Sequence, residues 1–202
     1  MSPTSRRGLT ARIGVAALGV GILAAAGGGS AFAADEDTVD VQVEIAPAAE
    51  PGVLALTVAD DATTLTEGEA SGTDRTFTGT LPTVTVTDTR LPENVDPEAY
   101  WYVMGAISDF AGDAGQPAIS SADSFGWYPT IVAGDSALVA PGDPVDPGIG
   151  GFVDAELLAN ADNSAAAAGG AYSASAGLVL QTPATVAPGA YSATITLTLL
   201  EG

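Results

Sequence analysis

The chain has 202 residues, of which 25 are acidic and five are arginine, and it contains no lysine, histidine or cysteine. Without these residue types it lacks the usual bases for a serine nucleophile, thiol chemistry, and imidazole or thiolate ligands for zinc. So acidic a protein is repelled by nucleic acid and by anionic lipid, and we expect no nucleic-acid partner and no cofactor.

The N-terminus has the three-part layout of a secretory signal peptide. Three arginines lie within the first 12 residues, an apolar run follows over 13–26, and small residues lead to Ala31-Phe32-Ala33. The apolar run is shorter than the roughly 20 residues of a membrane-spanning helix. We therefore predict a signal peptide over 1–33, cleaved before Ala34, and a secreted extracellular protein outside the membrane after cleavage.

Residues 34–202 fit one domain. They carry 25 acidic residues against two arginines, a net charge of −23. Without cysteine, no disulfide can stabilise this domain, so its stability must come from its packed core.

Alternation of apolar and polar residues dominates the chain after the signal peptide. It runs over 39–45, 54–58, 84–86 and 172–180, and is clearest over 191–199, where threonine and serine alternate with larger apolar residues. Proline–glycine and similar turn signals separate these runs. The pattern predicts an all-β fold, a single antiparallel β-sandwich of the immunoglobulin-like kind, with little or no helix outside the signal peptide.

Three segments depart from this alternation. Residues 154–161 are expected to form one or two helical turns capped by Asp154. The alanine- and glycine-rich stretch 163–170 reads as a loop, and the proline-rich stretch 140–148 reads as a stiff, exposed connection.

Asp88 and Arg90 end the alternating run 84–86. Residues two apart on a strand share a face, so the two side chains can meet. The favoured interpretation is an ion pair that closes a strand end and orders the loop leading to Trp101. The alternative is an arginine that contacts an anionic or sugar ligand.

Aromatic residues are densest over 100–102. Trp101 falls on the face that Val103 shares, and it is interpreted as a core residue of the sandwich. Tyr100 and Tyr102 fall on the opposite face, where core packing and stacking on a sugar ring both remain open.

A second aromatic pair, Trp127 and Tyr128, lies between Gly126 and Pro129. The glycine and proline place it at a strand end or in a loop. An aromatic lid over the edge of the core is favoured, and the alternative is a ligand-binding element carried by a loop. Tyr102, Trp127 and Tyr128 are therefore the candidate ligand-binding residues.

Carboxylates are the only acid–base groups left. A facing pair could hydrolyse a glycosidic bond, but with 25 acidic residues a pair by itself is not specific. No acidic cluster matches an EF-hand loop, so no metal site and no catalytic residue are predicted.

Four segments together, 84–90, 101–103, 108–110 and 189–199, resemble the WxL-type surface domain that Gram-positive bacteria export. The resemblance covers about residues 38–200 and places the family's Asp-Thr-Arg element on Asp88, Thr89 and Arg90, and its first tryptophan on Trp101. The chain differs in having Val103 where the family has leucine, and Thr-Leu-Thr-Leu near the end where the family has a second tryptophan motif. Its alanine-rich, lysine-free composition indicates an actinobacterial relative.

The resemblance implies a non-enzymatic domain that attaches non-covalently to cell-wall peptidoglycan or polysaccharide and assembles with other surface proteins. Two further functions stay open on the residues alone. One is a secreted carbohydrate-binding or adhesion module, and the other is a carboxylate-dependent glycoside hydrolase.

Overall fold

A computed structural model describes residues 51–68, 73–148 and 151–202. The predicted signal peptide and the predicted strand over 39–45 lie outside the described residues. Of the described helices, none is both long and apolar enough to cross a membrane.

The described residues form an all-β structure with two principal antiparallel sheets, so the predicted sandwich class is confirmed. The first sheet contains β1 (Leu54–Val58), β2 (Thr66–Glu67), β3 (Asp74–Thr80), β4 (Val84–Asp88), β7 (Phe125–Ala133) and β10 (Ala171–Pro183). The second contains β5 (Trp101–Ile107), β8 (Ala140–Pro141), β9 (Glu156–Ala161) and β12 (Ile195–Glu201). A small third sheet pairs β6 (Ala111–Gly112) with β11 (Tyr191–Ser192).

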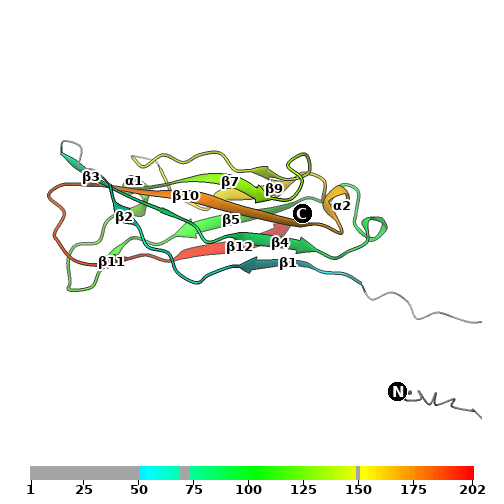
Figure 1. The fold of residues 1–202 in the computed structure, drawn as a ribbon, viewed down its shortest axis with the longest axis horizontal. Coiled ribbons are helices and arrows are strands. Elements are labelled where there is room, and N and C mark those ends of the chain that lie inside the picture. The colour runs from blue at the N-terminus through cyan, green and yellow to red at the C-terminus, as the bar shows by residue number, and fades with distance from the viewer. Residues whose placement is uncertain (1–50, 69–72, 149–150) are drawn as a thin grey trace, which may run out of the picture. The chain divides into compact units, whose positions relative to one another are not determined.

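Strand β10 organises the first sheet. Its 13 residues pair with β7 along one side, while β4 and then β3 pair with successive halves of its other side. In Figure 1, β10 accordingly runs the length of the sheet, with β3 and β4 meeting different halves of it. The first sheet thereby has a β4 half and a β3 half. The edge strand β1 pairs with β4 and so extends only the β4 half.

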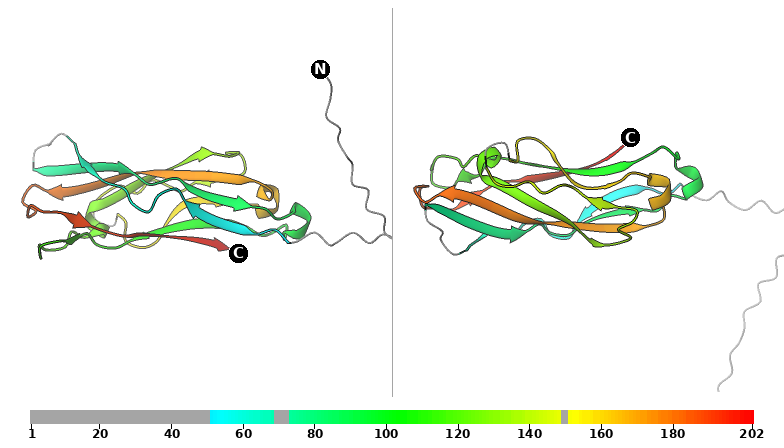
Figure 2. Two further views of the ribbon diagram at one scale, coloured as in Figure 1. Left: turned by 60° about the horizontal axis from the view of Figure 1, so that its bottom comes forward. Right: turned by 90° about the horizontal axis from the view of Figure 1, so that it is seen from above.

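In the second sheet, β5 lies between β9 and β12, and among the described strands β12 pairs with β5 alone. Figure 2 shows the two sheets as layers from two further directions. The alternation read from the sequence holds here, because Trp101, Val103 and Gly105 are buried between the layers while Tyr102 and Met104 are only partly buried on the other face.

The helices within residues 51–68, 73–148 and 151–202 are single turns. They are η1 (Pro92–Asn94), α1 (Ser121–Ser124) and α2 (Ser164–Ala167). The helical turns predicted over 154–161 are wrong, because Glu156–Ala161 is strand β9, with Leu158 and Ala159 both buried beside a bulge in its pairing with β5. The segment 163–170, predicted as a loop, contains α2, whose first turn is capped by the Asn163 side chain accepting from the Ala166 N–H.

Trp127 is the third residue of β7, so of the two placements predicted from its flanking residues, a strand end or a loop, the loop is wrong. Pro129 is tolerated there because β7 pairs with β10 on one side only, apart from a single bridge between Trp127 and Val145. The proline-rich connection 140–148 is therefore tied to the sheets by β8 and by that bridge.

The core is built from both layers and centres on aromatic side chains. Phe125 packs against Phe110 and Phe152, and the Trp127 ring meets Phe152 edge-on with centroids 4.9 Å apart. Trp127 needs a glycine opposite, since a Cβ at Gly105 would lie 2.6 Å from its Cη2 atom.

We expect Gly105→Ala to lower the free energy of unfolding by about 1–3 kcal/mol, because the added methyl overfills a packed interface. Thermal unfolding measures the loss, with Ala106→Val on the exposed face of the same strand as the control. An unchanged melting temperature in Gly105→Ala would mean that the Trp127 ring moves aside freely.

Candidate functional site

Arg90 connects three separate parts of the fold. Its Nε donates to Asp88 Oδ1 at 2.9 Å and its Nη2 to Asp88 Oδ2 at 2.7 Å. Nη1 donates to Glu201 at the end of β12, and Nη2 also donates to Ser164 Oγ in α2 at 2.8 Å. The guanidinium therefore joins β4 of the first sheet to β12 of the second.

Asp88 is buried, with 1% of its surface exposed. Besides the guanidinium, its Oδ1 accepts the backbone N–H of Arg90 at 3.0 Å. The hydrogen bonds to Asp88, followed by those to Glu201, raise the pKa of Arg90 above its ordinary value in spite of desolvation. Arg90 is thus committed to internal partners, and the geometry is that of the strand-end ion pair and not of a ligand-binding arginine.

The indoles of both tryptophans are buried, each with 0% of its surface exposed. Neither Nε1 atom has a hydrogen-bond partner among the described residues. Trp101 lies in the core, against Tyr172. The candidate role of Trp127 in ligand binding is corrected here, because a buried ring offers no face on which a ligand could stack.

Tyr128 points away from the core on β7, with 37% of its surface exposed. Its hydroxyl donates to Asp146 Oδ1 at 2.6 Å. That hydrogen bond, together with desolvation and the negative charge of Asp146, raises the pKa of the phenol. Tyr128 is available to solvent, but no other exposed aromatic residue adjoins it on β7.

The strongest exposed aromatic feature is a surface on the outer face of the second sheet, which we call the tyrosine face. Tyr100 and Tyr102 lie nearly parallel, with ring centroids 5.9 Å apart and an interplanar angle of 19°. Tyr102 is directly opposite Leu200 on β12 and Asn160 on β9. Exposed fractions of 46% for Tyr100 and 40% for Leu200 leave this apolar surface open.

Polar groups flank the tyrosine face. Met104 is opposite Thr198, whose side chain is exposed on the same face as Leu200. On the other side, Asn160 Nδ2 donates to Asp162 Oδ1 at 2.6 Å. The arrangement combines two flat rings with hydroxyl, amide and carboxylate groups, which is a suitable surface for a polar ligand with one apolar face.

Sequence reasoning found Tyr102 and weighed Tyr100, but it missed Leu200 and Asn160. One signal was available for Leu200. It follows the exposed threonines 194, 196 and 198 at the next outward position, so it breaks an otherwise polar face. Asn160 was missed because its segment was predicted to be helical.

The described residues contain no group of three or more acidic side chains placed to hold a metal ion. Two carboxylates do converge, those of Asp88 and Glu201, but both are bound to Arg90. That convergence belongs to the ion-pair network.

No family model matches the sequence, and a comparison with curated proteins gives no match. Among solved structures, a family 123 glycoside hydrolase from Clostridium perfringens, described in connection with glycolipid glycan hydrolysis, is similar at 17% identity. The similarity covers 61% of this chain and 18% of that one, with a TM-score of 0.28. A score this low carries no argument about fold or activity.

We expect Arg90→Ala to destabilise the protein by about 3 kcal/mol. It leaves the Asp88 carboxylate buried without its partner, and the value is at the low end for such a loss because Glu201 is partly exposed. Arg75→Ala, which removes the exposed Arg75–Glu67 pair, is the matched control and should change the melting temperature little. Adding Asp88→Asn to Arg90→Ala should recover part of the loss, and equal melting temperatures for both arginine variants would contradict the network.

Ionisation of Tyr128 provides a pH test. A raised phenol pKa means that this group's contribution to stability is present below the ordinary tyrosine pKa of about 10 and is lost as the pH rises through the folded-state value. We expect Asp146→Asn to move one tyrosine ionisation to lower pH in an ultraviolet titration, and Tyr128→Phe to remove that ionisation. Superimposable titration curves for the native protein and Asp146→Asn would refute this.

Proposed function

We propose that this protein is an exported, non-enzymatic surface module that associates non-covalently with cell-wall glycan, and that the tyrosine face is its contact surface. The observation that carries the proposal is the nearly parallel pair formed by the exposed Tyr100 and the partly buried Tyr102 beside the exposed Leu200. Aromatic rings at the surface of a sheet suit the apolar face of a sugar ring, and an exposed apolar patch commonly marks a binding surface.

The charge of the protein supports the same surface. With a net charge of −23 after residue 33, contacts with anionic wall polymers are unfavourable over most of the domain. Stacking on neutral sugar rings does not depend on positive charge. Hydroxyls of the sugar could then be bound by Thr198, Asn160 and Asp162 at the rim of the face.

The position of the tyrosine face on regular strands favours repeated or extended ligands. It extends across β9, β5 and β12 at the end of the sheet where the chain's last strand finishes. A flat surface of this kind can contact a glycan strand from the side without enclosing it. Such binding is expected to be weak for each site and to gain strength where many copies contact one polymer.

The test is co-sedimentation of the purified protein with isolated peptidoglycan sacculi. We expect Tyr100→Ala/Tyr102→Ala to reduce the affinity by about tenfold, because each ring contributes roughly 0.5–1.5 kcal/mol and each 1.4 kcal/mol is a factor of ten. Tyr128→Ala, which removes an exposed tyrosine from the other sheet, is the control and should leave binding unchanged.

The salt dependence separates stacking from charge. Binding through the tyrosine face should persist or strengthen at high salt, because salt screens the repulsion between the acidic domain and anionic wall polymers and does not weaken stacking. The proposed contact surface would be ruled out if Tyr128→Ala lost as much binding as the double variant Tyr100→Ala/Tyr102→Ala. It would also be ruled out if the native protein failed to sediment with the sacculi under every condition.

A further inference from the structure

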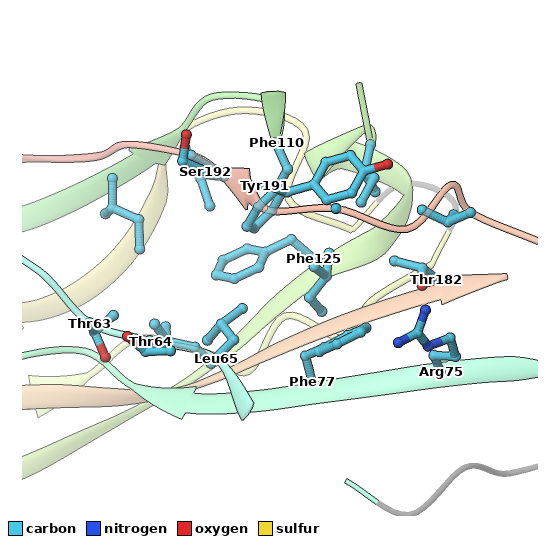
Figure 3. A pocket seen from close by; sticks show the side chains of 18 of the residues that line it. Thr63, Thr64, Leu65, Arg75, Phe77, Phe110, Phe125, Thr182, Tyr191 and Ser192 are labelled. Atoms are coloured by element: carbon cyan, nitrogen blue, oxygen red, sulfur yellow. The ribbon is translucent and has the colours of Figure 1, made fainter. Parts of the chain in front are cut away.

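A cavity of about 470 Å³ lies between the two sheets, in the half of the sandwich where β10 pairs with β3. Phe125 stands at its centre in Figure 3, with Phe77 and Leu65 on one side and Phe110 and Tyr191 on the other. The inner walls are completed by Leu178, Leu180, Ile107 and Ile195. In volume it resembles the pockets in which proteins hold small ligands, and its lining combines apolar side chains with hydroxyl groups and a guanidinium.

The strand pattern explains why this half stays open. Strand β1 ends at Val58 and pairs only with β4 among the described strands. The edge strand next to β3 is β2, which is only two residues long. On the opposite sheet, β5 is the one described strand that pairs with β12. Between these two edges no described strand closes the sandwich, and the cavity opens there.

The side chains around the opening are less buried than their counterparts in the other half. Leu65, Phe77, Tyr191, Ala193 and Ile195 are apolar but only partly buried. In the β4 half, Val84, Val86, Trp101 and Val103 are buried completely or nearly so. An apolar ligand in the cavity would remove further apolar surface from water, which is favourable by about 25 cal/mol per Å².

The rim carries a cation, which is rare in this chain. Arg75 and Arg90 are its two arginines after residue 12, and Arg90 is held inside the ion-pair network. Arg75 lines the cavity, with its guanidinium 5.2 Å from the centre of the Phe77 ring. Thr63, Thr64 and Ser192 place hydroxyl groups around the same opening (Figure 3).

Arg75 already binds one carboxylate in a two-point arrangement. Its Nε and Nη2 donate to the two oxygens of Glu67 at 2.7 and 2.8 Å. Both side chains are about a third exposed, so water and other anions can compete for the guanidinium. A second carboxylate could share or replace Glu67 at low cost, because exposed ion pairs contribute little.

We propose that this cavity binds a single-chain amphiphile, with its hydrocarbon tail between the sheets and its carboxylate on Arg75. The apolar side chains between the sheets suit the tail, and the guanidinium of Arg75, as the charged side chain among the described residues that line the cavity, is the donor that suits a carboxylate head. This site lies in the opposite half of the sandwich from the tyrosine face and is independent of the function proposed for that face.

Dodecanoate, used below the concentration at which it forms micelles, is a suitable ligand for calorimetry, with dodecanol and dodecyltrimethylammonium as analogues that differ in the head group. We expect dodecanoate to bind about threefold more tightly than the ammonium compound. Arg75→Gln should weaken dodecanoate about threefold and leave dodecanol unchanged, since only one partly exposed carboxylate contact is lost.

Filling the cavity tests its location. Ala193→Trp should reduce the affinity for dodecanoate and dodecanol by more than tenfold, while Ala106→Trp on the outer face of β5 should not. Ser192→Trp at the exposed rim serves the same purpose should the interior variant fail to fold. Peptidoglycan binding by these variants should stay native, which separates this site from the tyrosine face.

Three outcomes would overturn the proposal. They are a native protein that binds none of the three compounds, binding that survives both filling substitutions, and head-group preference that Arg75→Gln does not change. Self-association of the native protein in sedimentation velocity that the filling substitutions abolish, without any amphiphile binding, would assign the cavity to a second copy of the chain instead.

Discussion

The architecture depends on the buried carboxylate of Asp88 and the guanidinium that neutralises it. A carboxylate with 1% exposure is stable in its charged form only beside a cation and hydrogen-bond donors, and Arg90 supplies both from two residues away. Because the same guanidinium reaches Glu201 and Ser164, the requirement of one buried charge fixes the positions of the last strand and of α2. The relative placement of the two sheets at that end thus follows from a polar constraint as well as from apolar packing.

The two halves of the sandwich differ because this constraint acts at one end only. Next to Arg90, the valines of β4 and β5 and the ring of Trp101 fill the space between the sheets. In the other half, β3 replaces β4 beside β10, no equivalent ion pair joins the described strands of the two sheets, and the cavity lies there. At the first end, Arg90 links the two sheets through Asp88 and Glu201, close to the part of β5 and β12 that carries the tyrosine face.

Period-two alternation was sufficient to predict the fold class, because in a sandwich each strand must bury one face. It was sufficient to separate Trp101 from Tyr100 and Tyr102 for the same reason. It failed at β9, where a bulge places Leu158 and Ala159 on the buried side together and destroys the alternation. It also could not identify the cavity, since Phe77 and Tyr191 come to the same cavity through long-range pairings, of β3 with β10 and of β6 with β11.

The placement of Trp127 shows a second limit. Glycine and proline are turn signals in an isolated segment, but both are compatible with a strand at the edge of a sheet. Gly126 is required there by a close contact, because a Cβ would lie 2.3 Å from the carbonyl oxygen of Val145, and Pro129 lies beside Ala176 of β10. Gly126 and Pro129 therefore mark an edge strand that is crossed by the segment around Val145. They do not mark a loop that carries a binding residue.

The scarcity of positive charge gives the two surfaces different ligand chemistry. One of the two arginines beyond the predicted signal peptide is used inside the protein, so the tyrosine face has to work without a cation, through rings, hydroxyls and an amide. The other arginine lies at an opening lined by apolar and hydroxyl-bearing side chains, where its guanidinium is the charged group among the described residues that line the cavity. A neutral polymer on one face and an amphiphile with a carboxylate head between the sheets are thus the ligand classes that we propose for two separate places, the first for want of a cation and the second because a guanidinium donor is present.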